Sequence, residues 1–550
     1  MKVKVTKPSR FSPDDDLQYD FIIQQDDWND YSYATMYHLY LGGKHTPDKE
    51  VLYIGNFKII KKGQVNDNKK SVSPGEFLGL DNDFCSVGST LDYYERLAGL
   101  SKELKRGILI SLRDFTTFNY VDEGFKEESV WEKSIMRDIN EDDDIFTLPI
   151  FILKNNYDLI PSVDLKFSFS YDEALRPLVF DFKAKSFGRR SNQSLPGRLS
   201  VLVGRNGSGK SMTLARLSKV AFSSTTDRQT TSVRKTGIIK PEGLGFPKII
   251  NVSYSAFDSF QIPGLSYKEK LRLKKDIKNG RGRYIFCGVR DVVSELEFLL
   301  NENFNEDDDI TEFTVDRQHK TILKSIDVIS GEFERIISAI FKSRDKLALF
   351  DDVMDLLKED LSFTNIAEEL YKHKRKNTLL DYFSTLSTGH KFVLHSLSNI
   401  ILHIQKRALV LFDEPETYLH PPLLAVLMSA LRYILSDRDA FSIIATHSPV
   451  IIQETLGDNV NIISRVGNVI DFKRPTIETF GENLAMITTE VFFLNSNATD
   501  YHKVLDVLIE WAKTKEKKVA EQIKIIEDCF SNGLSSQARA YVFMQLAKEA

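Results

Sequence analysis

The sequence predicts an α/β fold built on a mixed sheet, and three apolar segments lead to this prediction. Residues 199–203 (LSVLV) form an apolar run that precedes a glycine-rich loop and a helical pattern at 213–219. Residues 408–412 and 441–445 are two further apolar runs, and each is followed by polar residues. Continuous apolar strands are typical of sheets that are buried on both faces.

The loop after the first run has the sequence GRNGSGKS at 204–211, which is the pattern of a phosphate-binding loop between a strand and a helix. Its glycines let the backbone wrap around phosphates, and the helix N-terminus adds partial positive charge. We expect Lys210 to neutralise the outer phosphates of ATP and Ser211 to hold Mg²⁺. The residues expected to contact the nucleotide are Gly204, Arg205, Asn206, Gly207, Ser208, Gly209, Lys210, Ser211 and Met212.

The two later apolar runs end in residues that suit hydrolysis of a phosphate ester. Asp413 and Glu414 have the position of a Walker B pair, in which Asp413 orients Mg²⁺ and Glu414 is the catalytic carboxylate that polarises the attacking water. His447 is expected to be a second catalytic residue, in contact with the terminal phosphate. Taken alone, the Asp413–Glu414 pair could be an acidic pair at a surface edge, and His447 could be a structural histidine. The order of the motifs along the chain favours an ATPase.

Residues 386–390 (LSTGH) precede a helical pattern and predict a helix N-cap at Ser387, with backbone donors free for a phosphate. The segment is typical of the signature loop of an ABC-type ATPase, although Thr388 and His390 replace the usual Gly and Gln. We expect Ser387 and Gly389 to contact the nucleotide. Gln261 and Asp258 both follow the strand-like residues 249–255, and either could contact Mg²⁺ or water; of the two, Gln261 is the metal-ligand candidate.

Together these motifs resemble the ABC-type ATPases related to Rad50, SMC and the overcoming-lysogenization-defect family. The resemblance covers about residues 160 to 480 and is carried by DEPE at 413–416, YLHP at 418–421 and ATHSP at 445–449. More narrowly, the chain is similar to the PtuA-type ATPases of Septu anti-phage systems, particularly those encoded with retrons. This narrower resemblance also uses the strand-like segment 254–260, the large amino-terminal elaboration and the lack of a nuclease module.

The resemblance implies an ABC-type head with a helical lobe, and a slow, regulatory ATPase that uses ATP and Mg²⁺. ATP would be sandwiched between two protomers, so that Ser387 and Gly389 of one protomer act on the phosphate loop of the other. The implied effector is an HNH endonuclease of the PtuB kind, joined in retron-linked systems by a reverse transcriptase and its multicopy single-stranded DNA. The alternative is a stand-alone DNA-repair or DNA-clamping ATPase of the RecF or Rad50 type.

Three regions are expected along the chain. Residues 1–160 mix strand-like stretches with Gly and Asp turns, which predicts a β-rich region that contributes to the outer sheet of the ATPase. Residues 161–490 are the ATPase core, with a helical insertion at about 261–385. Residues 491–550 are helical, and their apolar faces either pack on the head or dock a partner.

Composition narrows the function classes. A net charge of −5 over 550 residues argues against a uniformly basic nucleic-acid binder. Three cysteines without paired spacing disfavour a disulfide framework or zinc site and favour the cytoplasm. The apolar stretch 423–431 is too short to cross a membrane. One basic run gives four candidates for contact with nucleic-acid phosphates, with a solvated helix face as the equal alternative: Lys274, Lys275, Lys278 and Arg281.

Overall fold

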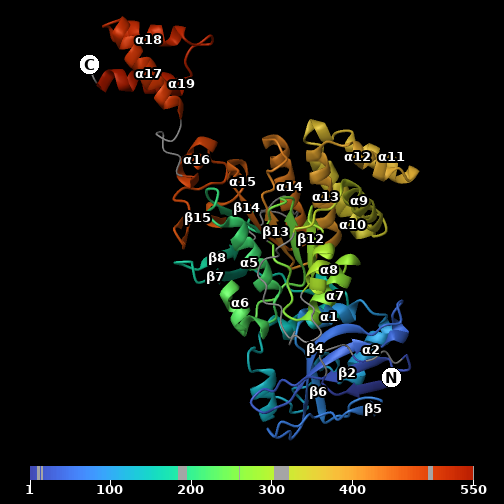
Figure 1. The fold of residues 1–550 in the computed structure, drawn as a ribbon. Helices are drawn as coiled ribbons and strands as arrows, with labels where there is room; N and C mark the ends of the chain where they lie inside the picture. The colour runs from blue at the N-terminus through green and yellow to red at the C-terminus, as the bar shows by residue number, and fades with distance from the viewer. Residues whose placement is uncertain are drawn as a thin grey trace. The chain divides into compact units, whose positions relative to one another are not determined.

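The computed structural model divides the chain into two units, Met1–Glu482 and Asn483–Ala550, and Figure 1 shows its helices and strands. It confirms the predicted α/β class, with a mixed sheet and a helical lobe. No helix among the described residues has both the length and the apolar character needed to cross a bilayer. The structure describes residues 1–8, 13, 17–183, 195–258, 260–302, 321–492 and 500–548.

The first unit is centred on a seven-stranded sheet in the order β12-β11-β13-β14-β9-β15-β16. Neighbouring strands are parallel except at the β15–β16 edge, so the sheet is mixed. The helices α5 and α13 pack against it, which buries the central strands completely and explains their unbroken apolar sequences. The strands are β9 (Leu199–Val203), β11 (Ile249–Ser253), β12 (Tyr284–Gly288), β13 (Leu409–Asp413), β14 (Phe441–Thr446), β15 (Val460–Val466) and β16 (Val469–Lys473).

A smaller antiparallel sheet in the order β10-β7-β8 shares an apolar core with the central sheet, and the two sheets with their helices are called the head. Buried phenylalanines of β7 and β8 join the apolar core that α5 shares with the central sheet. The elements around this core are β7 (Leu165–Ser170), β8 (Leu178–Phe182), β10 (Ile238–Lys240), α5 (Lys210–Phe222) and α6 (Thr231–Thr236), and two further helices of the first unit are α14 (Pro421–Asp437) and α15 (Pro449–Gln453).

The amino-terminal region forms a sheet of its own, in the order β5-β1-β2-β3-β4-β6. The expectation that residues 1–160 contribute to the outer sheet of the ATPase is therefore wrong: these six strands pair only with one another and close a separate apolar core. The elements are β1 (Val3–Thr6), β2 (Phe21–Gln25), β3 (Met36–Leu41), β4 (Leu52–Lys61), β5 (Gly75–Phe77), β6 (Phe84–Gly88), α1 (Leu91–Ala98), α2 (Lys102–Ser111), α3 (Asp144–Thr147) and α4 (Pro149–Leu153).

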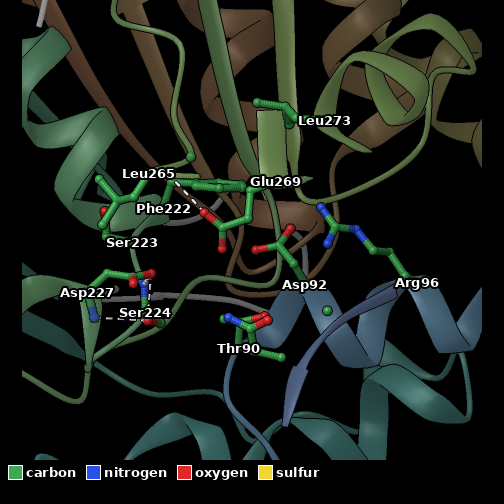
Figure 2. A pocket seen from close by; sticks show the side chains of 13 residues that line it. Thr90, Asp92, Arg96, Phe222, Ser223, Ser224, Asp227, Leu265, Glu269 and Leu273 are labelled. Atoms are coloured by element: carbon green, nitrogen blue, oxygen red, sulfur yellow. Dashed lines mark hydrogen bonds between the residues drawn. The ribbon is translucent and has the colours of Figure 1, made fainter. Parts of the chain in front are cut away.

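Buried ion pairs join this region to the head. Arg96 on α1 donates to Asp276 at 2.9 Å, and Arg283 donates to Asp92 at 3.0 Å. Figure 2 shows the cavity beside them, into which Glu269 also points. Its volume is about 30 Å³, which is room for very few waters. Buried ion pairs therefore hold the two regions together at this junction, and the cavity beside them is too small for a nucleotide.

The helical lobe follows β11 and is interrupted by one strand. β12 lies inside the segment expected to be a helical insertion, and it forms the edge of the central sheet. Residues 303–320 of this segment lie outside the described residues. The lobe helices are α7 (Tyr267–Lys278), α8 (Val292–Glu302), α9 (Ile326–Ile340), α10 (Arg344–Leu357), α11 (Ile366–Lys376) and α12 (Leu379–Thr385), and α13 (Thr388–His403) leads back to the sheet.

The second unit is helical, and three of its helices enclose a small core. Apolar side chains including Leu505, Ile526 and Val542 are buried among α17, α18 and α19. The helices are α16 (Leu484–Phe492), α17 (Asp500–Lys515), α18 (Val519–Asp528) and α19 (Ser536–Lys548). The three cysteines are free thiols, with Cys85 and Cys287 buried in the first unit and Cys529 exposed in the second.

Candidate functional site

The carboxyl ends of β9, β13 and β14 meet at one edge of the central sheet and bring the predicted motifs together. β14 lies between the other two strands, with Asp413 opposite Ala445 and Thr446 opposite Val203. His447 directly follows β14, so it falls between the phosphate loop on one side and the Asp413–Glu414 pair on the other.

The loop after β9 has the backbone geometry of a phosphate cradle. Gly207 and Gly209 have φ values of 79° and 100°, in the left-handed region that favours glycine. A Cβ atom on Gly204 would lie 2.3 Å from the carbonyl oxygen of Ile463. Lys210 begins α5, and its Nζ donates to the carbonyl oxygen of Gly204 at 3.0 Å. Burial lowers the pKa of Lys210, which an anion beside it would reverse.

Ser211 and Asp413 face each other across the loop. The Ser211 hydroxyl donates to Oδ1 of Asp413 at 2.8 Å. Burial raises the pKa of Asp413 to about 7, and the nearby carboxylates of Glu414 and Glu416 add to this while the bond from Ser211 opposes it. A hydroxyl and a carboxylate beside a phosphate loop are oxygen ligands that Mg²⁺ accepts together with phosphate oxygens.

Glu414 adopts a backbone conformation that is uncommon for a residue with a side chain. Its φ is 48°, in the left-handed region, and its N–H donates to the carbonyl oxygen of Ala445 at 2.9 Å. The carboxylate is partly open to solvent and lies 3.7 Å from Nδ1 of His447. The His447 side chain is 45% exposed. Both predicted catalytic side chains can therefore reach a ligand that enters from solvent.

Glu416 is a site residue whose role the sequence patterns did not predict. Its Oε1 accepts from the Thr446 hydroxyl at 2.6 Å and from the His447 N–H at 2.7 Å. The same oxygen lies 3.4 Å from Nδ1 of His447. Glu416 thus fixes the end of β14 that carries the histidine. The signal for it was present, because an acid follows Pro415 in the DEPE segment.

The signature segment has the predicted N-cap but bonds only within the helical lobe. Ser387 caps α13 and accepts from the His390 N–H at 3.3 Å. His390 in turn contacts the hydroxyl of Ser362. Ser387 is exposed, and a Cβ atom on Gly389 would lie 3.1 Å from the carbonyl oxygen of Tyr418. The start of α13 is therefore exposed at Ser387, although the His390 N–H is already used by the cap.

The two metal-ligand alternatives after β11 differ in their surroundings. Residues 254–258 form no strand, in contrast to the predicted strand-like segment. The Asp258 carboxylate is fully buried and pairs with Arg290. Oε1 of Gln261 is buried without a hydrogen-bond partner. Oδ2 of Asp258 is also buried without a hydrogen-bond partner, so both residues keep a free acceptor and the choice between them stays a prediction.

The predicted nucleic-acid residues do not form one continuous basic surface. Lys274 pairs with Glu297 at 3.4 Å, and Lys275 pairs with Asp48 at 3.1 Å. Lys278 and Arg281 are exposed. The run appeared basic because its carboxylate partners are remote in the sequence. Two of the four candidates, Lys278 and Arg281, are thus exposed, and contact of these residues with nucleic acid stays a prediction.

The residues present fit a nucleoside triphosphate with Mg²⁺. The Gly204 position has no room for a Cβ atom, and the buried Ser208 hydroxyl has no hydrogen-bond partner in the protein. Both features are expected of a loop that closes on phosphate oxygens. Among the described residues no group of three or more His, Cys, Asp or Glu side chains could hold a metal ion.

Comparison with known proteins gives one family match and one relative. Residues 199–453 match the family model described as "AAA domain, putative AbiEii toxin, Type IV TA system". This range includes the phosphate loop, Asp413, Glu414 and His447. Protein ea59 of Escherichia phage lambda is 28% identical over 496 residues, which cover 89% of this chain and 89% of that protein.

Two solved structures are similar to this chain at lower sequence identity. MJ1267, an ATP-binding cassette of an ABC transporter in its ADP conformation, is 14% identical and covers 59% of this chain and 93% of its own, with a TM-score of 0.27. A nucleotide-free ATP-binding cassette from an ABC transporter is 13% identical and covers 58% and 94%, with a TM-score of 0.25.

Proposed function

We propose that this chain, which carries a P-loop ATPase domain of the ABC/AAA kind, binds ATP with Mg²⁺ and hydrolyses it slowly as a regulatory step. The observation that carries the proposal is the convergence of the motifs at one sheet edge: Ser211 lies 2.8 Å from Asp413, and Glu414 lies 3.7 Å from His447. No single motif requires the others, so their meeting at one edge favours a common ligand.

Each side chain then has a distinct task. Lys210 and the loop N–H groups hold the phosphates, and Ser211 and Asp413 hold the metal. Mg²⁺, when bound, would neutralise the negative charge that develops on the phosphate oxygens. Glu414 accepts a hydrogen bond from the attacking water and so orients it. Glu416 keeps His447 at the end of β14, where its ring reaches the terminal phosphate.

The active form in this proposal is at least a dimer. Ser387 is exposed at the start of α13, a helix of 16 residues whose N-terminal dipole favours an anion. Because its hydrogen bonds stay within the helical lobe, the signature segment remains open to the nucleotide of a second copy. ATP then favours the closed pair, and hydrolysis favours its opening.

Two substitutions test the ATPase. Glu414→Gln keeps the size of the side chain but removes the carboxylate, so kcat should fall by roughly 10²-fold or more while ATP affinity is kept and the ATP-bound dimer accumulates. Lys210→Ala should instead weaken ATP binding, measured by calorimetry. Glu368→Gln, at an exposed position on α11, is the matched control and should leave both quantities unchanged. An unaltered hydrolysis rate in Glu414→Gln would remove Glu414 from the mechanism.

The biological setting we propose is anti-phage defence, in which the nucleotide state controls a separate HNH nuclease effector. In retron-linked systems a reverse transcriptase and its multicopy single-stranded DNA join the assembly. The resemblance of the DEPE, YLHP and ATHSP segments to Septu ATPases supports this setting, and the description of the matching family refers to a Type IV TA system. The competing role is a stand-alone DNA-clamping ATPase.

Purification of the tagged chain from its own operon separates these roles. Mass spectrometry should identify an HNH nuclease that copurifies, and its release should depend on ATP. Sequencing of the bound nucleic acid should detect retron DNA where a reverse transcriptase is encoded nearby. Recovery of a homodimer alone, with hydrolysis that DNA stimulates, would favour the stand-alone ATPase and overturn the regulatory role.

A further inference from the structure

A second cavity lies between β12, at the edge of the central sheet, and the helical lobe. Its walls are β12, the end of α7 and the start of α8, together with α9 and α13, which lie beside β12 in Figure 1. Its volume is about 580 Å³, within the range of pockets that bind small molecules. None of the phosphate-loop residues line it, so it is separate from the ATP site.

The lining carries more positive than negative charge. Six cationic side chains line the cavity but only two carboxylates, Asp291 and Glu332. Glu332 is already paired with Lys324 at 2.9 Å, and Asp291 accepts hydrogen bonds from Ser294. Arg290 is paired with Asp258 and Glu295, which do not line the cavity, so the excess positive charge of the lining comes from the other cations. The cations are Lys278, Arg281, Arg290, Lys324, Arg335 and Lys346.

Three of these cations lie at the rim and are exposed: Lys278, Arg281 and Arg335. In the part of the chain that the structure describes, none of the three forms an ion pair. They come from the end of α7, the following turn and the middle of α9, so separate elements direct positive charge to one opening. A phosphate group is the ligand that such a cluster of guanidinium and ammonium groups binds well.

The interior is also positively charged. Lys346 donates to the carbonyl oxygen of Leu402, and burial lowers the pKa of this lysine. Burial and the positive charges of Lys248 and Lys346 lower the pKa of His403 to about 3. His403 is therefore neutral near pH 7, and Lys346 supplies the positive charge inside the cavity.

The walls between these charges are apolar. Ile285 and Phe286 of β12, Val292 of α8, Ile336 of α9 and Leu402 of α13 line the cavity. Such a surface suits the flat, apolar body of a small molecule and gives a bare inorganic anion little to contact. A nucleic-acid strand is disfavoured, because the neighbouring Lys274 and Lys275 are already paired with carboxylates.

We propose that this cavity binds a small phosphorylated molecule with an aromatic ring, held by Lys278, Arg281 and Arg335 at the rim and by the apolar walls inside. The proposal does not depend on ATP hydrolysis, because the site is built from residues outside the phosphate loop.

Binding is tested on the full chain carrying Lys210→Ala, which should weaken binding at the ATP site. Phenyl phosphate is the probe, and titration calorimetry is the measurement. We expect saturable binding with one site per chain, and inorganic phosphate should bind about tenfold more weakly because it makes no apolar contacts. Adding Lys278→Glu and Arg281→Glu should weaken phenyl phosphate binding by about tenfold or more.

The matched control adds Arg375→Glu and Lys376→Glu, which reverse two exposed charges at the end of α11 outside the cavity. This control should bind phenyl phosphate as the parent does, and thermal unfolding should show both double variants folded. Three results would overturn the proposal: no binding of phenyl phosphate, equal losses in the two double variants, or a single-stranded 20-base oligonucleotide that binds in a manner dependent on Lys278 and Arg281 and displaces the probe.

Discussion

Three carboxylates crowd one segment of the candidate site. Asp413, Glu414 and Glu416 lie within four residues, and the negative charges of the latter two raise the pKa of Asp413 beyond the effect of its burial. One oxygen of Glu416 is buried without a hydrogen-bond partner. Such crowding is unfavourable in the protein alone, and it becomes favourable when a divalent cation adds positive charge.

This crowding predicts how stability depends on pH. Asp413 has a pKa of about 7 in the folded chain against 3.8 as the ordinary value, so the folded chain holds the proton more tightly. The free energy of unfolding therefore falls as the pH rises through this window. Asp413→Asn, which stays neutral, should stabilise the nucleotide-free protein by ~1–3 kcal/mol more at pH 8 than at pH 5, measured by urea unfolding.

The control for that experiment is Asp142→Asn, at an exposed position far from the site in sequence, which should show no such difference between the two pH values. If Asp413→Asn changes stability equally at pH 5 and pH 8, then Asp413 is ionised at both values and its pKa is not raised by the fold.

At the residue scale, the sequence predicted those site residues that belong to short local motifs. Ser211 and Asp413 belong to local patterns, and the structure brings them within 2.8 Å. The role of Glu416 depends on a contact with Thr446 and His447, which lie thirty residues further along the chain. A single sequence contains no sign of that contact, although it shows the acid itself.

At the scale of elements, the phosphate loop depends on two glycines for different reasons. A Cβ atom on Gly204 would collide with the backbone of β15, which cannot yield without disturbing the sheet. Gly207 has open space around it, and only its φ of 79° disfavours a side chain.

These reasons predict different costs. Gly204→Ala should lower the free energy of unfolding by ~2–4 kcal/mol, because β15 must shift, and Gly207→Ala by about 1 kcal/mol, because only the backbone is strained. Urea unfolding of the nucleotide-free protein measures both. Equal losses would mean that the loop moves away from β15 at no cost.

The helix α7 shows where element prediction fails. Its start follows from Ser266 and Glu269, which form a capping box. Its basic face was interpreted as solvated or as a nucleic-acid contact, yet Lys274 pairs with Glu297 and Lys275 pairs with Asp48. Charges that meet across long sequence separations cannot be distinguished from free charges in the sequence.

At the scale of the whole molecule, the two units have independent cores. The core formed by α17, α18 and α19 contains only residues of the second unit, and every strand of the central sheet belongs to the first. A chain that ends at Glu482 should therefore keep ATP affinity within about twofold and unfold at the same temperature. Calorimetry and thermal unfolding measure these quantities. A large loss of affinity would show that the second unit contributes to the ATP site.

The sequence predicted the central sheet better than the rest of the molecule. The phosphate loop, the Asp413–Glu414 pair and His447 are short local patterns at the ends of buried strands, so these patterns indicated the strands that carry them. The amino-terminal sheet has no such motif, and its independence depends on pairings such as Val3 with Phe77. Nor did the sequence show β12, because five residues, four of them buried, within a helical segment resemble one more apolar turn.

The strand order also sets the sequence in which parts of this chain can fold during synthesis. β9 pairs only with β14 and β15, and these emerge from the ribosome long after β9 itself. The amino-terminal sheet, by contrast, takes all its strands from residues 3–88 and can form early. The strand that leads into the phosphate loop therefore remains an unpaired, mostly apolar segment until β14 and β15 are made, and the nascent chain needs shielding from aggregation until β15 is complete.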